Sequence, residues 1–154
     1  VGNCAIAKRN LSVAADRQGD MHTALDEMAA AFALYDGTEM AREYLALLNR
    51  NGHYEKAWSV YSQLSVEAAN DERVMITAAA AALEVGAESF LQKVFAYPFA
   101  VIREGENQMV DIWFRHQAMQ KAAREGASDL MSIERSLRAT VRPPSNIDYR
   151  LTQA

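Results

Sequence analysis

Residues that could bind a metal or act as nucleophiles form no recognisable pattern in this chain. It has three histidines and one cysteine, and no HExxH or CxxC spacing occurs. Cys4 has no plausible set of ligands near it in the sequence. His22 and His53 fall in the turns of two similar segments, so repetition explains them better than coordination does. We therefore expect neither a bound metal nor a cofactor.

Residues that could support enzymatic catalysis are equally scattered. There is no GxSxG motif and no glycine-rich phosphate loop, because the seven glycines are dispersed. Carboxylate pairs such as Asp26-Glu27 and Asp71-Glu72 fall where helices begin or on solvated faces, where acidic groups complement the helix dipole. Acid–base catalysis needs two carboxylates converging in a pocket. We expect a protein without catalytic activity.

Length and composition restrict the classes of protein that remain. A chain of 154 residues, half of them hydrophobic, suits one compact unit with an ordered core. Its net charge of −4 argues against general binding to nucleic acids or anionic membranes. No apolar run approaches the roughly 20 residues of a membrane helix, and a single cysteine fits a cytoplasmic location. Since Val1 is not an initiator Met, we expect an excised piece of a longer protein or a processed chain.

The secondary-structure elements of the chain are expected to be helices. Ala, Leu, Glu, Met and Arg dominate, and all favour helix. Apolar residues at i, i+4, i+7 and i+8 mark one helix face, and they occur at Ala24, Met28, Ala31 and Phe32. A second apolar face comprises Ala57, Val60, Tyr61 and Leu64. The fold class predicted is all-α.

One sequence pattern occurs at a regular interval. GDMHTAL at 19–25 is echoed by GHYEKAW at 52–58, and glycines at positions 19, 52, 86 and 126 give steps of 33, 34 and 40 residues. A period near 34 is typical of helix–turn–helix arrays. Each glycine is expected to follow the first helix of a pair in a left-handed cap. The residues four before the glycines are Ala15, Leu48, Ala82 and Ala122.

These residues resemble the tetratricopeptide repeat family, most closely at NLSVAADRQGDMHTALDEMAAAFALYD (10–36) and around GHYEKAW. In the third and fourth copies, Leu91 and Met131 replace the usual small residue five after the glycine. The resemblance implies a right-handed α-solenoid of about four helix hairpins. The repeats would span residues 5–37, 38–70, 72–106 and 107–142, with an extended C-terminal tail at 143–154.

A narrower resemblance rests on YPFAVIREGEN (97–107) and PPSNIDYR (143–150). Their order is similar to the C-terminal repeats of a bacterial family whose members carry an upstream β-rich domain of unknown function with suspected carbohydrate links. It implies an alternative role as the accessory helical region of a larger carbohydrate-related enzyme. The repeats would then mediate domain packing or dimerisation.

The long third step contains an insertion. Pro98 should end the preceding helix near Ala96, and residues 103–106 read as a polar loop before an Asn107 cap. The insertion is either a packed connector or a contact loop. The connector is favoured by apolar residues that seek burial: Phe95, Phe99, Val101 and Ile102.

Two further features have open alternatives. Aromatic residues at helical spacing are expected to pack between helices, and a ligand-stacking cage is the alternative: Trp58, Tyr61, Trp113 and Phe114. Ile147, Tyr149 and Leu151 alternate as in a strand. The tail should therefore fold back along the last helix pair, and the alternative is a disordered end.

In tetratricopeptide arrays the first helix of each pair lines a concave groove that holds the partner. The resemblance thus implies these partner-binding residues: Arg9, Arg17, Arg42, Asn49, Arg50, Arg73, His116, Gln120 and Arg124. Arginine forks suit carboxylates, so the partner expected is a protein or an acidic peptide segment. A solvated helix face is the alternative, because Arg also favours helix ends. The function predicted is a protein–protein interaction scaffold, with homo-oligomerisation left open.

Overall fold

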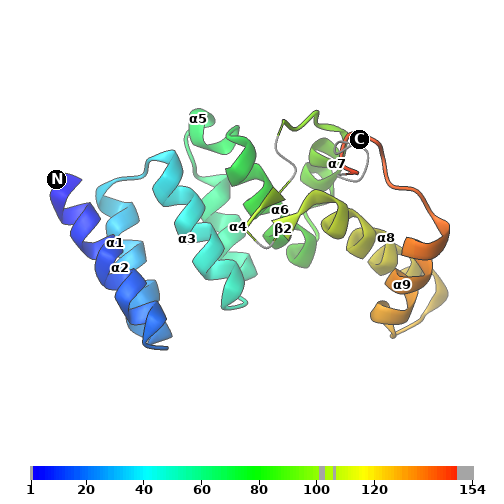
Figure 1. Ribbon diagram of the computed structural model, residues 1–154, viewed down its shortest axis with the longest axis horizontal. Coiled ribbons are helices and arrows are strands. Elements are labelled where there is room, and N and C mark those ends of the chain that lie inside the picture. The colour runs from blue at the N-terminus through cyan, green and yellow to red at the C-terminus, as the bar shows by residue number, and fades with distance from the viewer. Residues whose placement is uncertain (1, 101–102, 106, 149–154) are drawn as a thin grey trace.

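The helices of the chain follow one another in pairs. The computed structural model describes residues 2–100, 103–105 and 107–148. The pairs are α1 (Gly2–Arg17) with α2 (Met21–Leu34), α3 (Thr38–Arg50) with α4 (Tyr54–Ser62), α6 (Glu72–Val85) with α7 (Glu88–Ala96), and α8 (Met109–Glu125) with α9 (Leu130–Thr140). A short helix α5 (Val66–Ala69) follows the second pair, and the strands β1 (Arg103–Glu104) and β2 (Asn107–Gln108) follow the third. The predicted all-α class is confirmed, and Figure 1 shows the pairs in chain order along the long axis of the molecule.

The turn inside each pair is built in the same way. Gly19, Gly52, Gly86 and Gly126 all have positive φ, between 65° and 77°. After each glycine, the next N–H donates to the carbonyl five residues earlier: Asp20 to Ala15, His53 to Leu48 and Ala87 to Ala82 at 2.9 Å, and Ala127 to Ala122 at 3.1 Å. This closure is the Schellman motif, which favours glycine because the residue is left-handed. The glycine caps predicted from the spacing are confirmed.

The fourth turn differs from the others in length. Asp20 lies directly after its glycine and caps α2, with Oδ1 accepting the Thr23 N–H at 3.1 Å. Asp129 caps α9 in the same way, but it stands three residues after Gly126. Met131 is therefore not the counterpart of buried Ala24, and it is largely exposed. The assignment of Met131 to that repeat position was wrong because the turn is two residues longer.

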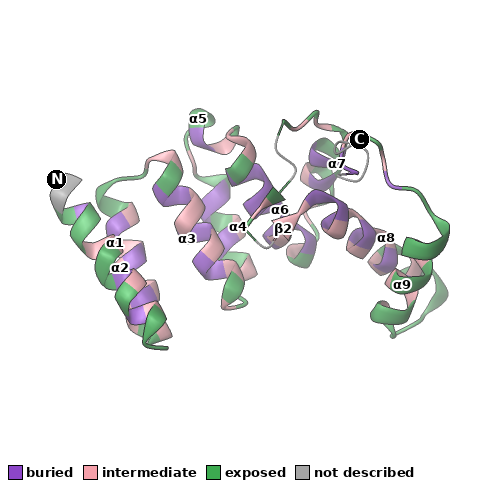
Figure 2. Cartoon of the chain, in the orientation of Figure 1, coloured by how far each residue is buried: buried purple, intermediate pink, exposed green. Residues whose placement is uncertain are grey.

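Helix α6 lies at the centre of the packing. Its buried residues belong to two hydrophobic clusters, one shared with α1–α4 and the other with α7 and α8. Ala78, Ala79, Ala81 and Ala82 are fully inaccessible, and such small side chains let α3, α4, α7 and α8 pack closely around α6. Figure 2 shows many buried residues on α3, α4, α6, α7 and α8, whereas α9 is mostly exposed.

Aromatic side chains join the second pair to the third. The ring of Phe90 on α7 lies 5.1 Å from the rings of both Trp58 and Tyr61 on α4. The Tyr61 hydroxyl donates to the Ala69 carbonyl at 2.9 Å, and burial raises the pKa of Tyr61 to about 12. Trp113 and Phe114 contact each other on α8 at 5.0 Å. The contacts of Trp58 and Tyr61 with Phe90 agree with the packing between helices predicted for them, whereas the Trp113–Phe114 contact lies within one helix.

The insertion after α7 forms a small hairpin rather than a loop. Helix α7 ends at Ala96, as Pro98 predicts. Strands β1 and β2 then pair antiparallel, and Gln108 rather than Asn107 caps α8. The Ala100 N–H donates to the Glu72 carboxylate at 3.0–3.1 Å, and both strands contact α6. Val101 and Ile102 lie outside the described residues.

The C-terminal segment returns to the middle of the molecule (Figure 1). Ser145–Ile147 form a turn, in which the Ile147 and Asp148 N–H groups donate to the Pro144 carbonyl, so the strand predicted here is wrong over these residues. Ile147 is completely buried against α6, α7 and α8. Asn146 Nδ2 donates to two carbonyls at the end of α7, of Phe95 at 2.9 Å and Tyr97 at 3.2 Å. The segment therefore folds back and anchors at the end of α7 and against α8 of the last pair; Tyr149 and Leu151 lie outside the described residues.

Within the described part of the chain, no helix has both the length and the apolarity needed to cross a membrane.

Candidate binding groove

A groove of about 660 Å³ runs across the first helices of the first three pairs. Most of its lining residues come from α1, α3 and α6, with Met28 of α2 and Tyr54 of α4. Val13, Ala46 and Ala80 line it, and each stands six residues before the turn glycine of its pair. The β1–β2 hairpin contributes Glu104, Gly105 and Asn107. The groove thus combines small apolar side chains with charged groups.

Two ion pairs link α1 to α3, and the arginine lies on α1 in one pair and on α3 in the other. Arg9 donates through Nε and Nη2 to both carboxylate oxygens of Glu43, each at 2.8 Å. This hydrogen bond and the charge of Glu43 raise the pKa of Arg9 above its ordinary value. On the same two helices, Arg50 Nη2 donates to Asp16 Oδ2 at 2.7 Å. In both pairs the partners are 34 residues apart, one repeat period.

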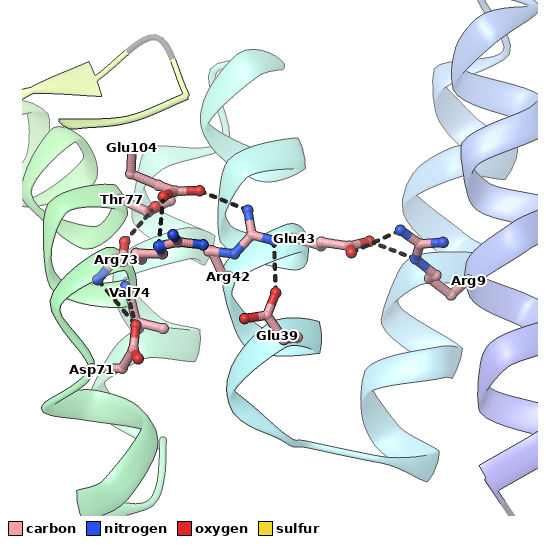
Figure 3. Close-up of polar contacts among 9 residues, drawn as sticks. All are labelled: Arg9, Glu39, Arg42, Glu43, Asp71, Arg73, Val74, Thr77 and Glu104. Carbon is pink, nitrogen blue, oxygen red and sulfur yellow. Dashed lines mark hydrogen bonds and ion pairs between the residues drawn. The ribbon is translucent and has the colours of Figure 1, made fainter. Parts of the chain in front are cut away.

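The hairpin supplies a third carboxylate to the groove. Glu104 Oε1 accepts a hydrogen bond from Arg42 Nη1 at 2.7 Å, and its Oε2 lies 3.6 Å from Arg73 Nε (Figure 3). Arg42 also donates to Glu39 at 2.8 Å. Burial opposes the charge on Arg42, but its hydrogen bond to Glu39 and the charge of Glu104 together raise its pKa. A carboxylate from a distant segment therefore occupies a two-arginine site.

In the Arg50–Asp16 and Arg73–Glu104 pairs the arginine is more accessible than the carboxylate. The side chains of Arg50 and Arg73 are 56% and 55% exposed, whereas those of Asp16 and Glu104 are 28% and 15% exposed. Each guanidinium has five N–H donors, and Arg50 uses one of them in the Asp16 pair. Arg50 in the groove and Arg73 at its border therefore offer hydrogen-bond donors to solvent, and such donors suit carboxylate or carbonyl oxygens.

Two polar atoms of groove residues have no hydrogen-bond partner among the described residues. They are Arg42 Nε and Asn49 Oδ1, and both are buried. The Asn49 amide nitrogen donates to the Thr77 carbonyl at 2.8 Å, which holds the side chain across α3 and α6. Buried polar atoms without partners are rare, and they cost free energy. Both belong to residues that line the groove.

The structure brings together most of the predicted residues from the first three pairs. Arg42, Asn49 and Arg50 line the groove, and Arg73 borders it through Glu104. Arg9 fixes the groove residue Glu43. Arg17 is exposed but does not belong to the lining. Arg42 is the less accessible of the two arginines in the lining, because Glu104 and Glu39 enclose it.

The predicted binding residues of the fourth pair do not reach the groove. His116 is buried, with Nε2 2.8 Å from Glu88 Oε2 and its ring against Phe95, so its assignment to the groove was wrong. Gln120 and Arg124 are exposed outside the groove lining. A smaller hollow next to α6 is lined instead by Asp111 and Arg115 of α8. The contacts of His116 with Glu88 and Phe95 of α7 place it in the packing between α7 and α8.

Sequence reasoning missed two carboxylates of the groove, Glu43 and Glu104. Glu43 could have been found, because it lies one repeat period from an oppositely charged arginine, Arg9. Glu104 has no such regularity, since it lies 62 residues from Arg42 in the insertion. The central position of Tyr54 beside Ala80 was also missed.

Among the residues that the structure describes, no group of three or more His, Cys, Asp or Glu side chains could hold a metal ion. No protein-family model, no curated protein and no solved structure matches the chain.

Proposed function

We propose that this chain is a right-handed α-solenoid of tetratricopeptide type and serves as a non-catalytic protein-interaction scaffold. Its groove would bind an extended segment of a partner protein that carries acidic side chains. Support for the architecture comes from the turn closure, repeated four times with a left-handed glycine. The lining of the groove by α1, α3 and α6, the first helix of successive pairs, agrees with it.

The observation that carries the proposal is the placement of Glu104 between Arg42 and Arg73. This contact has the geometry that an acidic side chain of a partner would adopt. Charge-assisted hydrogen bonds of this kind contribute about 1.5–3 kcal/mol when shielded from water. The accessible donors of Arg50 and Arg73 extend the same chemistry along the groove.

The form of the partner follows from the small side chains in the groove. Val13, Ala46 and Ala80 leave room for a polypeptide backbone between the charged groups. Tyr54 lines the same two hollows as Ala80 and offers an aromatic surface to an apolar side chain of the partner. An extended segment that alternates acidic and apolar residues fits this arrangement, because successive side chains point in opposite directions.

Selection from a random-peptide display library tests the proposal with peptides of every composition. We expect the selected peptides to be enriched in Asp and Glu. Each selected peptide is then measured against the wild type and two double variants by fluorescence polarisation. The groove variant is Arg50→Gln with Arg73→Gln, and the matched control is Arg17→Gln with Arg124→Gln.

Both double variants change the net charge by the same amount, but only the first alters the groove. We expect the groove variant to weaken binding at least tenfold, which corresponds to about 1.4 kcal/mol, and the control to change it less than twofold. An equal loss of affinity in the groove variant and the control variant would show that net charge and not the groove attracts the peptide. Unchanged binding in the groove variant would refute the proposal.

A further inference from the structure

We propose that Glu104 is an internal competitor, so that a carboxylate of an incoming partner binds Arg42 and Arg73 only by displacing it. This inference rests on the proposed function and adds regulation of the same site. The hairpin that carries Glu104 would set the affinity of the groove for acidic segments.

The geometry of Glu104 resembles that of a bound ligand. Its two carboxylate oxygens divide between two arginines that come from different helices, α3 and α6. Its side chain is 15% exposed, although it belongs to a short hairpin at the surface of α6. Gly105 and Asn107 of the same hairpin also line the groove. The hairpin therefore occupies space in the groove as well as neutralising charge there.

The arginine site would persist if Glu104 left it. Arg42 keeps its hydrogen bond to Glu39, which lies one turn earlier on the same helix. Arg42 would thus stay charged and held in place, with the Nη1 donor that now contacts Glu104 free for another oxygen. Arg73 is more than half exposed and could turn toward the same oxygen. Removal of Glu104 is therefore expected to open the site rather than dismantle it.

Glu39 and Glu104 provide a matched comparison. Both are carboxylates bound to Arg42, but only Glu104 lies in the groove, while the Glu39 side chain is 70% exposed. Fluorescein-labelled hexaglutamate serves as the probe, and its affinity is measured for the wild type, Glu104→Gln and Glu39→Gln. Each substitution removes one negative charge that contacts Arg42, so the two variants undergo the same change in net charge.

We expect Glu104→Gln to bind hexaglutamate at least fivefold more tightly than the wild type does, and Glu39→Gln to differ less than twofold. The conservative variant Glu104→Asp keeps the net charge, but its shorter side chain reaches the two arginines less closely than the Glu104 side chain does. It should therefore also gain affinity, by a smaller factor. Adding Arg42→Gln to Glu104→Gln should cancel the gain.

Equal gains in Glu104→Gln and Glu39→Gln would overturn the inference, because they would show a field effect. No gain in Glu104→Gln and none in Glu104→Asp would overturn it as well. If the Arg50 and Arg73 double variant still loses its display-selected peptides in that case, the groove remains the binding site and only the competition is refuted. If that double variant binds the display-selected peptides as tightly as the wild type does, the proposed function itself fails.

Discussion

Arg9 and Glu43 lie one repeat period apart in the sequence and form a two-pronged ion pair between α1 and α3, with both contacts at 2.8 Å. Asp16 and Arg50 join the same helices with the charges exchanged. A pair of this geometry fixes the direction of both side chains, unlike a single contact. The register between the first two helix pairs is therefore specified by charge as well as by apolar packing.

Reversing one of these charges should destabilise the protein, and reversing both should restore it. Arg9→Glu places two carboxylates together, which is expected to cost about 1 kcal/mol, since the pair is only partly shielded from water. The double variant Arg9→Glu with Glu43→Arg should recover most of that loss in thermal denaturation. Additive losses in the double variant would show that the pair contributes nothing specific.

The turn glycines should resist substitution for reasons of backbone conformation alone. Gly52 has φ of +74°, and a Cβ added there would meet nothing within 4 Å. Gly52→Val should therefore lower the free energy of unfolding by about 1 kcal/mol or more, and Gly52→Asn by less, because Asn tolerates the left-handed region. Urea denaturation measures both. Equal stability of the Val variant and the wild type would contradict the cap.

The C-terminal anchor should be a strong determinant of stability. Ile147→Ala is expected to cost about 2–5 kcal/mol, because its side chain is completely buried in the second cluster. Ile6→Ala is the control, since Ile6 is 56% exposed and should change stability by about 0.5 kcal/mol or less. A melting temperature of the Ile147 variant equal to that of the control would mean that the anchor is not formed in solution.

Glu88 should contribute to acid denaturation. The hydrogen bond from His116, assisted by one from Gln92, lowers the pKa of Glu88 below its ordinary value of 4.5. A carboxylate with a lowered pKa in the folded state stabilises the protein above pH 4.5, and the contribution is lost as the pH falls through the folded pKa. Glu88→Gln should therefore lose less stability than the wild type between pH 6 and pH 3. If thermal denaturation shows the same loss of stability in the wild type and in Glu88→Gln, the contact between Glu88 and His116 does not contribute to stability.

The sequence pattern correctly predicted the helix ends, because these depend on residues close by in the sequence. Gly19 and Gly86 marked the ends of first helices, because a left-handed glycine closes a helix wherever the chain must turn back. Pro98 marked the end of α7 for a similar local reason. The place of His116 was predicted wrongly, since its burial depends on its contacts with Glu88 and Phe95 of α7. Local pattern does not contain that information.

The charged site was predictable only in part. Arg42 and Arg50 follow from the repeat positions, and the pairs Arg50–Asp16 and Arg9–Glu43 both obey the same period. The contact of Glu104 with Arg42 spans 62 residues and depends on how the β1–β2 hairpin folds over α6. Such a contact is set by tertiary structure, so sequence spacing could not place the carboxylate in the groove.

The central claim is that partner segments bind along α1, α3 and α6. It is tested most directly by NMR, with a display-selected peptide that carries a nitroxide spin label, added to the isotope-labelled protein. We predict that the label broadens the amide signals of the groove residues Ala46, Asn49, Arg50, Thr77 and Ala80, and leaves those of α9 unchanged. Broadening confined to the second helices or to α9, with the groove signals unaffected, would contradict the account.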